Sequence, residues 1–449
     1  MRRISRLAAG FVLVASLLTP TASASPPLCR DHRCPPPGPV GMARLFTSGA
    51  ETADLTTEGL TIGAGTPTID TGQVRSGSRS FKFNAGAGNA IQALTLSLTG
   101  TVVGRAYFAR AYFYYTAAPS ADTRVFGFLS QISVYVKTTG VLVVRMANAG
   151  TVDKGATSAA LVANTWYRLE IMQQMRSGSA DDDWEFRLDG ATVSSATGET
   201  LGTVAPTGIG YGYGTNAPGA NYVMYLDDIA LNDDQGASQN TWPGDGKVVL
   251  LSPTALSAGG TGWTDDQAAS TAAALLAAVD NTPPNGIADT TAGGGNHQDR
   301  NATSNASSNL DMTMTTYSAA GIGVGDTINV IDPIVATAAP VSTSAKAGTV
   351  GVVSNPAIAN VSLGAGGTSG AFWSGTAAGT YPTGWKISHG TTTYAPSVTV
   401  GTAPVMRVTQ VTSSTRIAMV CFMGMYVDYT PLVAAFIPPS NQMAQLLAG

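Results

Sequence analysis

Three stretches decide the fold of this chain: Asn164-Thr-Trp-Tyr-Arg-Leu-Glu170, Trp184-Glu-Phe-Arg-Leu-Asp-Gly190 and Tyr222-Val-Met-Tyr-Leu-Asp-Asp-Ile-Ala-Leu-Asn-Asp233. Apolar and polar residues alternate in each of them with a period of two, the pattern of a half-buried β-strand. Aromatic and β-branched residues are frequent, and such side chains pack well across neighbouring strands. The three stretches therefore predict a domain built from antiparallel sheets.

Further strands separated by turn residues are predicted upstream of these three. They are Ser80 to Phe83, Ile91 to Leu98, Gly104 to Tyr115, Arg124 to Val136 and Val141 to Met146. Short strands at this spacing are typical of a β-sandwich, and about nine strands fit one domain over residues 42–235. The closing strands resemble those of a laminin-G/concanavalin-A-like jelly roll.

A polar turn cluster at residues 236–247 predicts a linker to a second domain over residues 248–449. That domain begins with the only convincing helix of the chain, predicted over 264–280. Its start has capping-box form (Thr264-Asp-Asp-Gln267), and Ala268, Ala272, Leu275, Leu276 and Val279 recur on one face. Strands resume afterwards, at Leu310 to Met314, Thr327 to Ile331, Thr349 to Val353, Gly384 to Ser388, Val405 to Val411 and Ile417 to Tyr429. The predicted fold class is all-β, with two jelly-roll-like β-sandwich domains, the second carrying one short amphipathic helix.

Composition agrees with an all-β extracellular or virion-type protein. The chain has 449 residues, which favours two domains, and only 12% of them are charged while 52 are glycine. Residues 42–449 hold 19 basic and 27 acidic residues, a net charge of −8 that argues against nucleic-acid binding. Residues 301–449 contain only four acidic and four basic residues, which suggests that much of this surface touches other protein.

The order of elements resembles that of actinobacteriophage minor tail and other virion proteins. The resemblance covers about residues 42–449 and rests on the order of its segments, since no single motif is diagnostic. These segments are Tyr225-Leu-Asp-Asp-Ile229, Trp242 to Thr254, Gly262-Trp263, Val279 to Gly286, Tyr381 to Trp385, Tyr394 to Thr399 and Val405-Met-Arg-Val408. It implies a structural component of a phage tail or fibre, with other virion proteins as partners, a homo-oligomeric state and a host-surface glycan as a further contact.

Residues 1–41 lie outside the predicted fold, and two interpretations of them remain open. Arg2, Arg3 and Arg6 followed by the apolar Leu7 to Leu18 and by Ala22-Ser-Ala24 have the form of a secretory signal, too short in its apolar part to span a bilayer. Alternatively, translation begins at Met42, because Met42-Ala-Arg-Leu-Phe-Thr-Ser-Gly resembles the start of many phage virion proteins. A true signal would instead favour a secreted, lectin-like surface adhesin, so the predicted location is the virion tail, with the cell surface as the alternative.

The three cysteines predict no catalysis. Cys29 and Cys34 could close a small disulfide after export or, less plausibly, bind a metal with His32, which would leave zinc one ligand short. Cys421 lies in an apolar run, where a thiol behaves as a small buried hydrophobe.

Catalytic residues are not predicted elsewhere either. A sandwich-fold glycosidase, the third functional alternative, needs two carboxylates facing each other across a groove. Glu170 and Glu185 come nearest, but they alternate with apolar residues and are predicted to face outward into solvent. His297 and His389 lie in predicted loops without the context of a catalytic triad. The chain is therefore predicted not to be an enzyme.

Two kinds of ligand site are predicted instead. Tyr211, Tyr213 and Tyr222 flank a loop with Asn216 at the sandwich rim, where aromatic rings could stack on a sugar. No cofactor is predicted, with structural calcium as an alternative at Asp181, Asp182 and Asp183 or at Asp227 and Asp228, because a hard cation prefers clustered oxygens. One of Asp227 and Asp228 must point inward on an alternating strand, which favours a structural role in bonding backbone donors.

Overall fold

A computed structural model gives the architecture of the chain. It describes residues 44–55, 58–98, 100–146, 152–176, 180–214, 217–235, 239–259, 263–265, 271–277, 279, 298–300, 308–338, 348–352, 361–362, 403–410 and 419–432. The leader with Cys29 and Cys34, as well as His297, His389, Asn216 and the predicted strand at 384–388, lie outside the described residues.

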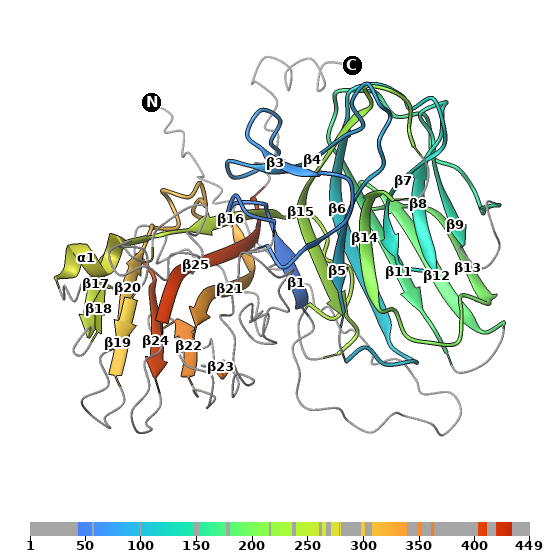
Figure 1. Cartoon of the computed structure of the whole chain (residues 1–449). Coiled ribbons are helices and arrows are strands. Elements are labelled where there is room, and N and C mark those ends of the chain that lie inside the picture. Colours follow the sequence, from blue (N-terminus) through green and yellow to red (C-terminus); the bar gives the residue numbers. More distant parts are fainter. Residues whose placement is uncertain are drawn as a thin grey trace, which may run out of the picture. The chain divides into compact units, whose positions relative to one another are not determined.

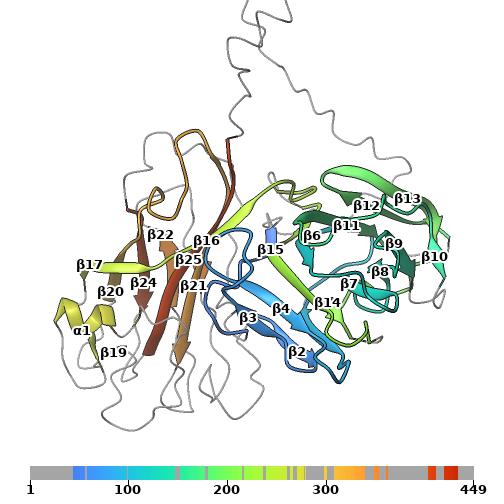
Figure 2. The same cartoon turned by 90° about the horizontal axis from the view of Figure 1, so that it is seen from above.

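The first part of the chain is a sandwich of two antiparallel sheets, and Figure 2 shows β11 to β13 in one layer and β7 to β9 in the other. The first sheet has the order β13-β12-β11-β6-β15-β4-β3, with β1 also pairing with β15. Its strands are β1 (Arg44–Ser48), β3 (Thr68–Asp70), β4 (Ser80–Asn84), β6 (Ala106–Tyr115), β11 (Tyr167–Gln174), β12 (Asp182–Leu188), β13 (Ala191–Glu199) and β15 (Val223–Asp233). The second sheet has the order β10-β9-β8-β7-β14-β5-β2. Its strands are β2 (Thr61–Ala64), β5 (Gln92–Ser97), β7 (Thr123–Phe128), β8 (Ile132–Val136), β9 (Leu142–Met146), β10 (Asp153–Lys154) and β14 (Gly208–Tyr213).

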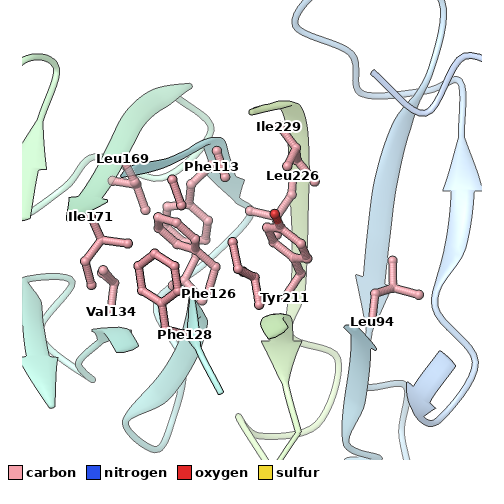
Figure 3. Close-up of a cluster of buried hydrophobic side chains, with 14 of the residues drawn as sticks. Leu94, Phe113, Phe126, Phe128, Val134, Leu169, Ile171, Tyr211, Leu226 and Ile229 are labelled. Carbon is pink, nitrogen blue, oxygen red and sulfur yellow. The ribbon is translucent and has the colours of Figure 1, made fainter. Parts of the chain in front are cut away.

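The core of the sandwich lies between these sheets, as the alternation predicts. Phe113 of β6, Ile171 of β11 and Leu226 of β15 face Phe126 and Val134 of the second sheet (Figure 3), and all five side chains are buried. Because side chains alternate along a strand, the neighbours of these residues on β6 and β11 are turned to the outer face of the first sheet. The core therefore fixes which residues can form a site on that face.

A β-bulge interrupts β15 at Asp227 and Asp228. Asp227 pairs with Tyr112 of β6 and Ala230 with Arg110, so that three steps on β15 match two on β6. Asp228 has a φ of 49°, in the left-handed region. The bulge places both aspartates between the core residues Leu226 and Ile229, and both are buried.

The second part of the chain contributes two further antiparallel sheets (Figure 1). One has the order β16-β25-β19-β18, with β21 also pairing with β25, and the other has the order β17-β20-β24-β22-β23. The strands are β16 (Lys247–Leu251), β17 (Pro253–Gly259), β18 (Trp263–Asp265), β19 (Gln298–Arg300), β20 (Ser308–Met314), β21 (Thr327–Ala338), β22 (Gly348–Val352), β23 (Val361–Ser362), β24 (Val405–Gln410) and β25 (Met419–Thr430).

The helix α1 (Ala272–Ala277) differs from its prediction at the start. Thr264 belongs to β18, which pairs with β19, so the predicted capping box is in part a strand. Leu275 and Val279 are buried in the core as predicted, whereas Ala272 is exposed.

The all-β fold class is confirmed, and the sandwich has more strands than the nine predicted. Arg124 to Val136 forms the hairpin of β7 and β8, and the short or polar strands β1, β2, β3 and β13 have no clear alternation of apolar residues. The residues from 40 to 449 fall in one compact unit, and the division into two domains at 236–247 stays a prediction. Among the described residues, no helix has the length and apolar character needed to cross a membrane.

Candidate functional site

Charged and aromatic side chains lie together on the outer face of the first sheet, and this face is the candidate site. On β6 the side chains of Phe108, Arg110, Tyr112 and Tyr114 alternate with the core residues and therefore point outward. Arg110 and Tyr112 are nevertheless buried. The chain itself must cover the middle of this face.

Residues of the connection between β15 and β16 provide that cover. The ring of Trp242 lies edge-on to Phe108 with centroids 5.3 Å apart, and the Arg187 guanidinium lies 4.0 Å from the Trp242 ring centroid. The backbone N–H of Gly244 donates to Glu170 Oε1 at 2.8 Å. The Tyr112 hydroxyl donates to Asp245. This segment thus occupies the centre of the face with hydrogen bonds and ring contacts.

A fully buried ion cluster lies beside the cover and joins the sandwich to β25. Asp428 Oδ2 accepts from Arg44 at 2.6 Å and from Arg110 at 3.0 Å, and Asp428 Oδ1 accepts from Asn329 at 3.3 Å. The three charged side chains have no exposed surface. Burial alone would raise the pKa of Asp428, but the charges of Arg110 and Arg44 hold that pKa below its usual range. We call Arg44, Arg110 and Asp428 the arginine–aspartate triad.

The bulge aspartates extend this polar network. Asp227 Oδ2 accepts from the backbone N–H groups of Arg75 and Ser76, at 2.9 and 3.3 Å. Asp228 accepts from the Arg75 guanidinium at 2.5 Å and from the backbone N–H of Val248 at 2.6 Å. Burial and the neighbouring charge of Asp228 raise the pKa of Asp227. Both carboxylates therefore accept hydrogen bonds from loop or strand backbones, the structural role that the sequence favoured, and calcium at this pair stays a prediction.

A second buried cluster joins the N-terminal region of the sandwich to β25. Tyr426 donates its hydroxyl to Glu58 Oε1 at 2.5 Å and accepts the backbone N–H of Glu51 at 2.9 Å. The Glu51 carboxylate accepts from the backbone N–H groups of Ser78 and Arg79. Burial raises the pKa of Glu51 to about 7, although the hydrogen bonds from Ser78 and Arg79 oppose the shift.

The predicted glycan platform is contradicted by burial. Tyr211, Tyr213 and Tyr222 all belong to the sandwich core, and Figure 3 shows Tyr211 among the core side chains. Tyr211 stacks on Phe126, and Tyr213 meets Tyr222 edge to face. Their rings cannot stack on a sugar in solvent, and Asn216 lies outside the described residues.

The aspartates of the 181–183 run surround an arginine. Asp182 is buried and accepts the backbone N–H groups of Arg176 and Leu201, both at 2.7 Å. Asp183 pairs with the Arg176 guanidinium at 2.7 Å, and Asp181 accepts from it through its carbonyl oxygen. No group of three or more His, Cys, Asp or Glu side chains among the described residues could hold a metal ion. The Arg176 guanidinium therefore balances part of the charge of this run, and calcium at Asp181, Asp182 and Asp183 stays a prediction.

The predicted orientation of Glu170 and Glu185 is right, while the predicted solvation of Glu170 is wrong. Glu170 is 1% exposed because Gly244 covers it, and its Oε2 lies 3.3 Å from Arg168 Nε. Glu185 is partly exposed and accepts from Arg187 and Thr192. Sequence reasoning missed Arg44, Arg110 and Asp428, although a charged residue within an apolar strand pattern is a signal that it has some buried partner.

Comparisons with known proteins complete the description. A scan against models of protein families and a search of curated proteins found no match. Among solved structures, the chain is similar to a cellulose-induced protein (18% identity, 44% of this chain and 100% of that one, TM-score 0.33). It is also similar to a carbohydrate esterase from the Shiga toxin-encoding bacteriophage phi24B (16% identity, 44% of this chain and 100% of that one, TM-score 0.34). A third similar structure is the binding domain of botulinum neurotoxin DC (10% identity, 44% of this chain and 49% of that one, TM-score 0.33). Similarities this low say nothing about what this chain binds or cleaves.

Proposed function

We propose that the protein is a non-catalytic structural component of a phage virion, a minor tail or fibre-associated protein that holds other virion proteins. The observation that carries the proposal is the arginine–aspartate triad. It ties the first strand of the sandwich, its central strand β6 and the late strand β25 through side chains with no exposed surface. A body closed in this way transmits force and presents fixed surfaces, which a structural subunit requires.

Two further features support this role. The few charges of residues 301–449 suit a surface that is covered by other subunits. The carboxylates that a hydrolase would need are engaged within the fold: Glu51 and Glu58 are buried with their donors, and Glu170 accepts from Gly244. The chemistry of general acids and bases requires groups within reach of a substrate.

Mass spectrometry of density-purified particles tests the proposal. Peptides spanning both parts of the chain should be present at a constant ratio to the major tail protein, and they should remain after a high-salt wash. Recovery of the chain only in the soluble fraction or with cell envelopes would refute the proposal and favour a secreted adhesin. Turnover of an oligosaccharide that is abolished by Glu170→Gln or Glu185→Gln would refute its non-catalytic part.

A further inference from the structure

Three aromatic side chains, from β15, β6 and the residue before β11, contact one another on the outer face of the first sheet. The rings of Tyr114 and Trp166 have centroids 5.3 Å apart, and those of Tyr114 and Tyr225 are 5.8 Å apart. Tyr225 of β15 pairs with Tyr114 of β6 across the sheet, and Trp166 is the residue before β11. We call Tyr225, Tyr114 and Trp166 the aromatic row.

Trp166 is the member of the row that meets solvent. Tyr114 and Tyr225 are each 8% exposed, whereas Trp166 is partly exposed. Its indole Nε1 is buried and has no hydrogen-bond partner among the described residues, so the part of the side chain that meets solvent is the ring. The two tyrosines therefore support an indole ring with one accessible side.

Hydrogen-bonding groups surround this ring. Asn164 is exposed, and its Oδ1 accepts from the Tyr114 hydroxyl at 3.0 Å, so its amide is held beside the row. Arg168 lies two residues along the same face, near Asp245, whose side chain is 46% exposed. A partly exposed aromatic ring with a few fixed polar groups is the arrangement that orients a small polar ligand.

The charged side chains near the aromatic row form ion pairs with one another. Lys82 Nζ lies 2.7 Å from Asp70, Arg75 lies 3.0 Å from Asp245, and Arg168 lies 3.3 Å from Glu170. An anionic ligand would have to displace these carboxylates, while sugar hydroxyls can both donate to them and accept from the guanidinium groups. The C–H groups of a pyranose ring also match the electron-rich face of an indole.

We propose that Trp166, supported by the aromatic row, binds a neutral hexopyranose unit of a surface glycan. This inference rests on the proposed function, to which it adds the class of host ligand. It concerns the outer face of the first sheet, so it replaces the buried Tyr211, Tyr213 and Tyr222 with a different site.

Binding to the purified full-length chain tests the proposal separately from its place in a particle. The probes are the neutral maltohexaose, cellohexaose and mannohexaose, with hexagalacturonate and sialyllactose as anionic comparisons, followed by tryptophan fluorescence and calorimetry. We expect at least one neutral hexasaccharide to bind with a Kd that is unchanged between about 50 and about 500 mM salt, over which the Debye length falls about threefold, because no net charge is involved.

The variants locate the site. Trp166→Ala should raise the Kd at least tenfold, and Asn164→Gly, which removes the exposed amide and suits the left-handed φ of 61° there, should raise it severalfold. Tyr135→Ala is the matched control, since Tyr135 is a partly exposed aromatic residue on the second sheet, beside Arg145. The proposal is overturned if no neutral hexasaccharide binds, if only the anionic probes bind, or if both Trp166→Ala and Asn164→Gly bind like the parent chain.

Discussion

Replacing Asp428 by Asn should be among the most damaging single changes in the protein. The substitution keeps the shape of the side chain and an acceptor oxygen, but it removes the only carboxylate that contacts both Arg44 and Arg110 among the described residues. Two guanidinium groups without exposed surface would then lie next to each other. Removing one partner of a buried ion pair costs about 3–5 kcal/mol, because the remaining charge is desolvated without compensation.

The other hydrogen bonds of Arg44 and Arg110 place the expected loss of stability at the lower end of this range of about 3–5 kcal/mol. Arg44 still donates to Asn232 at 2.5 Å and to Gln239 at 2.9 Å, and Arg110 still donates to the Asp228 carbonyl oxygen at 2.9 Å. These acceptors satisfy hydrogen bonds but not charge. We therefore expect a loss of about 3 kcal/mol, a change of roughly a hundredfold in the unfolding equilibrium constant.

Urea denaturation followed by tryptophan fluorescence measures this loss, and limited proteolysis reports whether the connection around Trp242 opens first. The control is Glu199→Gln, which removes a partly exposed pair with Lys154 at 3.5 Å and should cost at most about 1 kcal/mol. If Asp428→Asn proves no more destabilising than Glu199→Gln, the triad does not hold the two parts together, and the reasoning is refuted.

Two further predictions concern the same junction. Glu51 has a folded-state pKa of about 7, above its unfolded value, so the free energy of unfolding should fall as pH rises from about 4.5 to 7. Glu51→Gln should remove up to about 3 kcal/mol of that pH dependence. Urea midpoints of both proteins, measured at about pH 5 and about pH 8, check this. Gly246→Ala should destabilise the chain by about 1–3 kcal/mol, because the new Cβ would lie 2.3 Å from an Arg110 nitrogen and 2.4 Å from an Asp428 oxygen. Gly88→Ala, where the Cβ meets nothing within 4 Å, is its control, and equal thermal midpoints for the two variants would contradict this packing.

Local alternation was sufficient to predict the sandwich strands, and it also contained a signal that sequence reasoning passed over. In β14, Ile209, Tyr211 and Tyr213 share one face and glycines occupy the other. That grouping with Ile209 predicts a buried face for the tyrosines. Gly210 must stay small because a Cβ there would lie 2.7 Å from Leu129, so the glycines serve close packing and not a flexible binding loop.

Contacts between distant segments could not be predicted in the same way. Arg44 and Asp428 are 384 positions apart, and nothing in their neighbouring residues specifies the pairing. The outward face of Glu170 followed from alternation, but its burial depends on a connecting segment whose path no local pattern encodes. The bulge at Asp228 likewise breaks the period-two rule from which the orientation of the aspartate pair was derived.

The use of ions at this junction has a consequence for folding. The last strand of the sandwich ends at Asp233, while Asp428 is synthesised much later, so Arg44 and Arg110 face water until β25 is made. Charged residues keep that waiting surface soluble, whereas an apolar patch there would promote association of partly made chains. The triple variant Arg44→Met, Arg110→Met, Asp428→Leu should therefore match or exceed the parent in urea resistance, since a packed apolar trio avoids the desolvation cost of buried ions. It should nevertheless give a lower soluble yield than the parent on expression at about 37 °C. Equal soluble yields would show that the triad does not keep the partly made chain soluble.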